Sequence, residues 1–386
     1  MLSLNSYKDE IVTDDFLHVM EKMFKFACII GVFGSRRYIS YIWAACVLAV
    51  LIFVEYHAVW KVIKALAGWA IDMAGHRSVA ARFAGTIFYT ISIVCLILVS
   101  KLFYSWPDLA ATWVKVERMT AVKIPEDRTL KKRMYIVASI CCPVVFEHVM
   151  SVLSIIGFDC PRELLLKKYV MLSHGFMILR HEYSEWYAFP LIIINCIATF
   201  LWNFQDVLIV LISIGLTSRY NRLNQFLANK SESVKLYTWR KLREAYVKQA
   251  FLVRKVDAAL GGIIVLSCMC NFYFICLQLF MGITQGPIST PIKKAYYAVS
   301  LAWLCMRVTS VILAASDINI HSRSALRHIY AYDTHGYNVE VDRLQDQLSK
   351  DYVALSGMGF FYLNKNILLQ VYGWRNNNLR TSPHTI

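Results

Sequence analysis

The sequence predicts an all-α polytopic membrane protein. We expect a seven-helix bundle with a cytoplasmic N-terminus, which is the reverse of the orientation of a G-protein-coupled receptor. Hydrophobic residues make up 57% and charged residues 17% of the 386 residues, whereas a soluble domain has about 45–50% and about 25%. Several stretches stay apolar over the roughly 20 residues that a spanning helix needs. Lys and Arg gather in alternate loops, which is the usual signature of cytoplasmic loops.

The expected spans follow from the apolar stretches. The first 38 residues are charged throughout and form an expected cytoplasmic segment. A seventh span is weaker, because Lys365 interrupts it, and residues 374–386 form a polar tail. The transmembrane domain therefore covers residues 39–373, with spans at about 39–61, 83–103, 134–158, 187–216, 260–283, 296–318 and 351–373.

The positive charges set the orientation. Of the 41 Lys and Arg residues, 27 fall in the N-terminal segment and the second, fourth and sixth loops, and 10 fall in the first, third and fifth. The net charge of +15 is therefore explained by topology, and we expect the lipid bilayer rather than nucleic acid as partner. The fourth loop has apolar residues at helical intervals, which predicts cytoplasmic helical extensions at 219–255 and 319–350.

Enzyme motifs are missing from the sequence. It has no phosphate-binding loop, no dinucleotide fingerprint and no nucleophile elbow. The pairs Glu147-His148 and His181-Glu182 are adjacent, whereas a helical metal site needs a spacing of four residues. We therefore expect no catalysis, no cofactor and no metal.

Polar and aromatic residues inside the spans share helix faces. In the fourth span they recur at intervals of 4, 7 and 11 residues and end at Asp206, and the sixth span repeats this pattern and ends at Arg307. Such groups are expensive in hydrocarbon and imply a partner or a hydrated pocket. Arg307 is the natural counter-charge for Glu147 or Asp206. The candidate ligand-binding residues are Glu147, His148, Ser151, Asn195, Thr199, Trp202, Asn271, Gln278, Tyr297, Ser300, Trp303 and Arg307.

Aromatic faces together with amides and carboxylates suit a small polyhydroxylated ligand such as a sugar. Two other interpretations stay open for these residues. They could form interhelical hydrogen bonds that only hold the bundle together. Alternatively, charged groups at mid-depth would also suit a secondary transporter, although the sequence has neither the inverted repeats nor the broken helices of that class.

Two segments resemble the insect gustatory receptors, and specifically their sugar-receptor clade. They are FLWNFQDVLIVLISIGL at 200–216, followed by SRYNRLN at 218–224, and VALSGMGFFYLNKNILLQV at 353–371. The resemblance implies an odorant- and gustatory-receptor-like fold, with four subunits around one cation pore that a tastant opens. It also implies a ligand pocket among spans two to six, an anchor at the cytoplasmic ends of spans four to seven, and the plasma membrane of gustatory neurons as location.

The sequence departs from the family's pattern after Val371, where family members continue into a hydrophobic pore segment. The tail at 374–386 is polar, so the seventh span is expected to be truncated. Asn364, Lys365 and Gln370 are the pore-region residues that remain. We therefore expect either a sugar-gated cation channel subunit or a non-conducting form that assembles with full-length partners as a homo- or hetero-tetramer.

Overall fold

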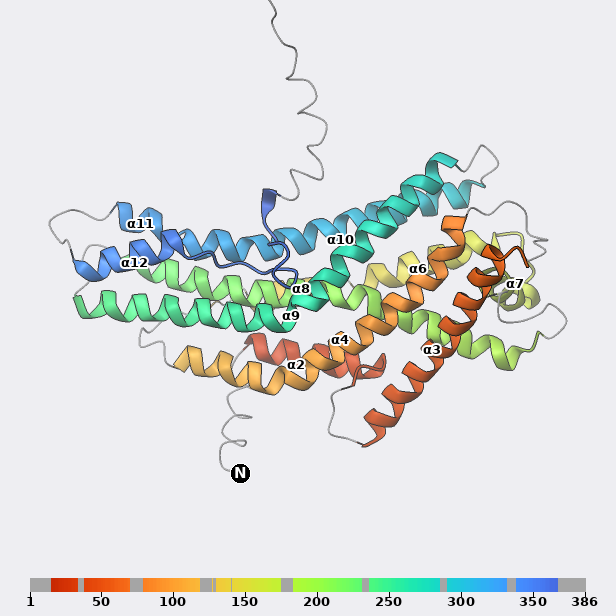
Figure 1. Ribbon diagram of the computed structural model, residues 1–386, viewed down its shortest axis with the longest axis horizontal. Helices are drawn as coiled ribbons and strands as arrows, with labels where there is room; N and C mark the ends of the chain where they lie inside the picture. The colour runs from red at the N-terminus through yellow and green to blue at the C-terminus, as the bar shows by residue number, and fades with distance from the viewer. Residues whose placement is uncertain are drawn as a thin grey trace, which may run out of the picture.

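Six helical stretches in the described part of the chain are long and apolar enough to cross a membrane. The computed structural model describes residues 15–33, 38–69, 79–118, 127, 130–139, 141–174, 183–230, 236–284, 290–331 and 338–366. Most of the helices run along the long axis of the molecule, and α3 crosses them at an angle (Figure 1). The stretches are α3 (Tyr38–Leu66), α4 (Val79–Arg118), α5 with α6 (Leu130–Ala138 and Cys141–Ile156), α8 (Glu185–Lys230), α9 (Leu236–Thr284) and α10 (Pro291–Arg323).

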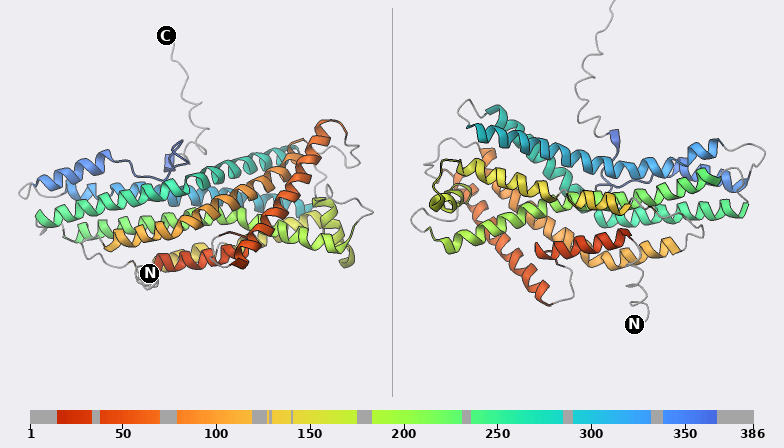
Figure 2. Two further views of the ribbon diagram at one scale, coloured as in Figure 1. Left: turned by 60° about the horizontal axis from the view of Figure 1, so that its bottom comes forward. Right: turned by 180° about the vertical axis from the view of Figure 1, so that it is seen from behind.

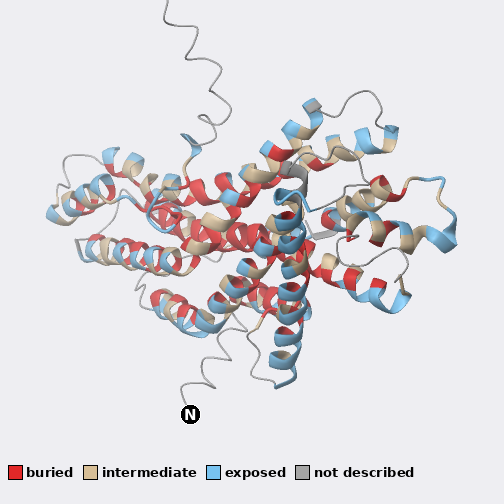
Figure 3. Ribbon diagram, turned by 45° about the vertical axis from the view of Figure 1, so that its right-hand side comes forward, coloured by how far each residue is buried: buried red, intermediate tan, exposed pale blue. Residues whose placement is uncertain are grey.

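Helix α8 is the centre of the bundle. It contacts α3, α4, α5, α6, α7 (Leu165–Ser173), α9 and α10, and both views of Figure 2 place it among the other long helices. In its most apolar 18-residue window 83% of the residues are buried, against 28% in α3. Burial is concentrated where the long helices meet, and the outer helices are largely exposed (Figure 3). The exposed apolar side chains of α3 therefore suit contact with lipid.

The third span is interrupted near Pro143. Helix α5 ends at Ala138 and α6 begins at Cys141. A proline has no N–H group, and its ring clashes with the carbonyl four residues earlier, here that of Ser139. The break between α5 and α6 therefore lies one turn before the proline. The Ser139 hydroxyl there donates to the carbonyl of Ile136 at 2.6 Å.

A helix that the sequence analysis did not predict lies within the N-terminal segment. Helix α2 (Asp15–Ile29) buries one face and leaves its charged side chains outside. Phe16 stacks on Trp113 of α4 with ring centroids 4.1 Å apart. The same ring packs on Gly215 of α8, where a Cβ atom would lie 2.5 Å from Phe16 Cδ2. The segment at 1–38 therefore contributes part of the core.

Helices continue beyond the expected inner ends of the spans. Helices α8 and α9 run through most of 219–255. The end of α10, together with α11 (Leu326–Tyr330) and α12 (Val339–Lys350), lies within 319–350. The Tyr246 hydroxyl of α9 donates to the amide oxygen of Asn224 of α8 at 2.6 Å. Arg243 of α9 pairs with Glu340 of α12 at 2.8 Å. These contacts hold the extensions together as one packed layer.

The seventh span does not begin at Asp351 as expected. Residues 351–364 are not helical, and an antiparallel bridge joins Ser356 to Tyr362. Gly359 has a φ of 81°, which favours glycine. The backbone N–H and the hydroxyl of Ser356 donate to the Asp257 carboxylate of α9 at 2.5 and 2.8 Å. These bonds satisfy the polar groups of Ser356 although the segment is not helical. We call residues 355–363 the α9-docked turn.

Candidate ligand-binding site

Four helices bring together the polar and aromatic helix faces predicted from the sequence, which we call the polar stripes. Helix α10 packs along α8, and α6 contacts both of them, while α9 packs against α8 and α10. At the centre the Arg307 guanidinium donates to the Asp206 carboxylate from Nε at 2.9 Å and from Nη2 at 2.5 Å. Both side chains are buried, with 4% and 5% of their surface exposed. Of the two counter-charges expected for Arg307, its hydrogen bonds are thus to Asp206.

Further donors complete the shell around the Asp206 carboxylate. The Ser267 hydroxyl and the Asn271 amide, both of α9, donate to it at 2.5 and 3.1 Å. A third hydrogen bond of Arg307, from Nη2, reaches the backbone carbonyl of Trp202 at 3.1 Å. A buried ion pair is stable only when additional hydrogen bonds satisfy its remaining lone pairs and protons. These bonds satisfy the Asp206 carboxylate and two of the three guanidinium nitrogens of Arg307, whereas the buried Nη1 has no partner among the described residues. The pair therefore ties α8, α9 and α10 together.

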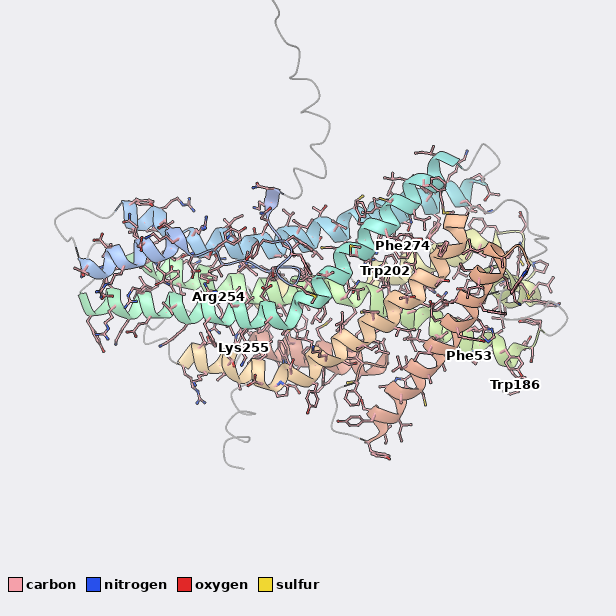
Figure 4. All side chains as sticks on the ribbon, viewed as in Figure 1. Phe53, Trp186, Trp202, Arg254, Lys255 and Phe274 are labelled. Atoms are coloured by element: carbon pink, nitrogen blue, oxygen red, sulfur yellow. The ribbon has the colours of Figure 1, made fainter. Side chains whose placement is uncertain are left out.

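Trp202 lies between a cation and another ring. The Arg307 Cζ atom is 4.4 Å from the centre of the Trp202 ring, a geometry in which a cation is attracted to the ring face. Figure 4 shows Trp202 of α8 beside Phe274 of α9, and their ring centroids are 4.7 Å apart. Within the described residues, the buried Trp202 Nε1 has no hydrogen-bond partner. A donor is therefore available at the edge of this aromatic group.

A second polar group joins α6, α9 and α10. The Ser300 hydroxyl donates to Glu147 Oε1 at 3.0 Å and accepts from the Gln278 amide at 2.7 Å. The Tyr296 hydroxyl also bonds Glu147. The buried Gln278 Oε1 has no partner among the described residues. We call Glu147, Gln278, Tyr296 and Ser300 the carboxylate cluster. It carries an acidic group and an open acceptor.

The remaining stripe residues of α8 and α10 lie between these groups. The Trp303 Nε1 donates to Asn203 Oδ1 at 3.2 Å, and the Asn203 amide donates to the carbonyl of Thr199 at 2.8 Å. The Thr199 hydroxyl lies 3.4 Å from His148 Nδ1. These contacts run continuously from α10 across α8 to α6. Trp303, Thr199 and His148 therefore belong to one connected network.

Three predicted residues lie at the edge of that network. The Asn195 amide donates at 2.5 Å to the hydroxyl of Tyr169 on α7. Ser151 is hydrogen-bonded to Tyr296. Tyr297 packs instead against Gly282 of α9, where its hydroxyl would collide with any Cβ atom. Tyr296, one position earlier, is the tyrosine that meets Glu147, and it lies four residues before Ser300 on the same face of α10.

Four contributors were missed by the sequence analysis. Asn203 and Ser267 lie inside spans, where a serine or an asparagine alone carries little signal. Tyr169 and His174 come from the third loop, in which Tyr169 lies on α7 and His174 directly follows that helix. His174 Nε2 is hydrogen-bonded to the Tyr89 hydroxyl at 2.7 Å. Burial lowers the pKa of His174 to about 4, so it is neutral at physiological pH. This loop therefore packs onto the bundle through buried polar contacts.

Of the predicted pore-region residues, Asn364 and Lys365 are described, and neither belongs to the network. Lys365 Nζ is 3.6 Å from the carboxylate of Asp317 on α10, and a short helical segment begins at Lys365. Asn364 immediately precedes that segment. Gln370 and the tail at 374–386 lie outside the described residues. Within the described part of the chain, no group of three or more His, Cys, Asp or Glu side chains is arranged to hold a metal ion.

The sequence profile of the trehalose receptor family matches residues 35–374 of the chain. The chain belongs to that family. It is 32% identical to the gustatory receptor 5a for trehalose of Drosophila melanogaster, over 278 residues that cover 69% of this chain and 61% of the relative. It is 29% identical to the gustatory receptor for sugar taste 64a of the same organism, over 308 residues that cover 76% of this chain and 67% of the relative.

These relatives place the chain among the insect gustatory receptors of the sugar clade, as the two sequence segments indicated. The fold is shared with the olfactory receptor OR5 of the insect Machilis hrabei, at a TM-score of 0.65 and 12% identity over 93% of this chain and 97% of that one. Its complex with eugenol matches at a TM-score of 0.61 and 13% identity. The predicted all-helical receptor fold is confirmed, and the chain is a multi-pass membrane protein.

Proposed function

We propose that this chain is a subunit of a sugar-gated, non-selective cation channel in the plasma membrane of gustatory neurons. Family membership supports the sugar, because the relatives are named for trehalose and for sugar taste. The resemblance to the gustatory receptors implies assembly of four subunits around one pore, and we propose that Asn364 and Lys365 lie beside that pore; the fold shared with OR5 is compatible with this arrangement. The observation that carries the proposal is the buried polar and aromatic network on α6, α8, α9 and α10.

The chemistry of that network fits a polyhydroxylated ligand. A sugar hydroxyl both donates and accepts hydrogen bonds, and the apolar face of a sugar ring packs on aromatic side chains. The carboxylate cluster supplies acceptors at Glu147 and at Gln278 Oε1, and Trp202 Nε1 supplies a donor without a partner. Trp303 adds a second indole nearby. We propose that binding at these groups on α8, α9 and α10 shifts the helices against each other.

Sugar-evoked currents in cells that express the chain test this function. We expect wild-type protein to give inward current with trehalose or another sugar. Gln278→Leu removes the open acceptor, and Trp303→Phe removes the bond to Asn203. We expect each change to raise the half-maximal sugar concentration about ten-fold, the effect of losing one buried hydrogen bond. Trp186→Phe is the matched control, because Trp186 is exposed at the start of α8.

Three outcomes would count against the proposal. Unchanged responses in the Gln278 and Trp303 variants would remove the network as the sugar site. Uptake of labelled sugar into vesicles without current would indicate a transporter. Silence of surface-expressed protein, with and without another subunit of the family, would contradict the channel itself, whereas current only with such a subunit would assign this chain a non-conducting role.

A further inference from the structure

A cavity lies between α2, α3 and α4, and none of the residues that line it belongs to the polar network. Its volume is about 840 Å³, within the 300–1,000 Å³ of typical small-molecule sites. Phe24 and Ile29 of α2, Trp43 of α3, and Phe103 and Trp106 of α4 form much of its wall. Only three of its thirteen lining residues are polar. A cavity of this composition favours a largely apolar occupant.

The position of the cavity identifies the medium around it. It lies where α3 begins and where α4 approaches its last turns. The Lys and Arg distribution predicts that both of these ends face the cytoplasm. Figure 1 shows that the start of α3 diverges from α2 and α4, which leaves the cavity beside an open angle between helices. The cavity is therefore expected to face the cytoplasmic leaflet of the bilayer.

The rim of the cavity is apolar and exposed on the side of α3. Ile29, Ile39 and Trp43 keep 69%, 79% and 42% of their surface exposed. Apolar surface in contact with water is unfavourable by about 25 cal/mol per Å², so these residues suit contact with hydrocarbon. The cavity is thus open to acyl chains rather than closed around a dry core.

Polar groups border the same cavity. Lys25 and Glu21 of α2 form an exposed ion pair at 2.9 Å, and both line the cavity. The buried hydroxyl oxygen of Ser40 has no hydrogen-bond partner among the described residues. Pro107 has no N–H group, so the Phe103 carbonyl lacks its helical donor. Apolar walls with polar groups at the margin match an amphiphile, and the Lys25 ammonium suits its phosphate group.

From these observations we propose that the cavity binds the acyl chain of a phospholipid of the cytoplasmic leaflet, with the headgroup at the Lys25 side. The lipid would fill the angle between α2, α3 and α4. The site is independent of the sugar network and does not rest on the proposed function. A sugar would be a poor occupant, because few hydrogen-bonding groups line the walls.

Photolabelling of the full chain in lipid vesicles tests the proposal. The probe is a phosphatidylcholine with a diazirine on its acyl chain, and labelled residues are mapped by mass spectrometry. We expect label on the cavity side of α2 and α4, at Phe24 and Trp106. Ala110→Trp fills the cavity and should reduce this label about ten-fold, as expected when about two methylenes lose their contacts. Ala111→Trp is the matched control, because Ala111 is the exposed neighbour.

A second pair of variants guards against misfolding of the first. Ile39→Asp places a charge at the rim, and Ile42→Asp places the same charge on an exposed residue of α3 outside the lining. Of these two variants, only Ile39→Asp should reduce the label at Phe24, in protein that elutes as wild type does. Equal label in all variants, or label confined to outward residues such as Ile42, would overturn the proposal. Label that reaches the cavity only after removal of residues 1–14 would overturn it too, because the occupant would then be the chain's own N-terminus.

Discussion

The buried ion pair between Arg307 and Asp206 allows a quantitative prediction. Arg307→Met keeps a long apolar side chain but removes both hydrogen bonds to the Asp206 carboxylate, at 2.9 and 2.5 Å. The carboxylate would stay buried, with Ser267 and Asn271 as its remaining donors. Removal of one partner from a buried pair destabilises a protein by about 3–5 kcal/mol. We expect a loss of this size, because both side chains are almost fully buried.

The thermal midpoint of detergent-purified protein, followed by size-exclusion chromatography, measures this loss. We expect Arg307→Met to lower the midpoint on the order of ten degrees. The double variant Asp206→Leu with Arg307→Met should recover most of that loss, because no unpaired charge is then buried. Arg240→Met is the control, since its pair with Glu244 is exposed and contributes about 0–1 kcal/mol.

Two results would refute this reasoning. Arg307→Met could melt within a degree of wild type, which would mean that the pair is solvated or not formed. The double variant could instead lose the sum of the two single losses, which would mean that the two residues do not interact energetically.

Three further predictions concern the helices around the bundle. Gly215→Leu should displace α2 from α8 and destabilise the fold by about 1–3 kcal/mol, seen as protease cleavage in α2; wild-type resistance would contradict the close packing. Asp257→Asn should weaken the bonds to Ser356 by about 1–3 kcal/mol and expose residues 351–364 to protease before the rest of the chain melts. The hydrogen bond from Arg243 lowers the pKa of Glu340 from its usual 4.5. This pair therefore stabilises the fold above pH 4.5, and the contribution is lost as the pH falls through the lowered pKa. Glu340→Gln should remove that part of the acid sensitivity in melting curves.

Much of the fold could be predicted because bilayer spans depend on local hydropathy. The polar stripes were equally visible, since helical spacing places Trp202 and Asp206 on one face whatever the rest of the chain does. The sequence did not show which carboxylate pairs with Arg307. Glu147 and Asp206 were both near enough in depth, and only the packing of α10 along α8 decides between them.

The errors have local physical causes. Helix α2 was not predicted because the N-terminal segment is rich in charged residues, which indicated a solvated segment. Its apolar residues are nevertheless spaced so that Phe16, Met20 and Phe24 lie on one helix face. The turn after Asp351 has an apolar composition, which predicted a membrane span. Its conformation depends on a carboxylate about a hundred positions earlier in the chain, Asp257, which accepts two hydrogen bonds from Ser356. A contact over such a separation leaves no trace in local composition.

The α9-docked turn connects Lys365, which follows it in the chain, to α9. Figure 1 shows α9 bent along its length, and Gly261 and Gly262 near its middle are the residues that permit a bend. A Cβ atom on Gly261 would lie 3.0 Å from the backbone nitrogen of Met358. Asp257 holds the same turn one helical turn earlier. Because the turn contacts α9 at Asp257 and at Gly261, we expect any change in the bend of α9 at its glycine pair to displace the turn and, with it, Lys365.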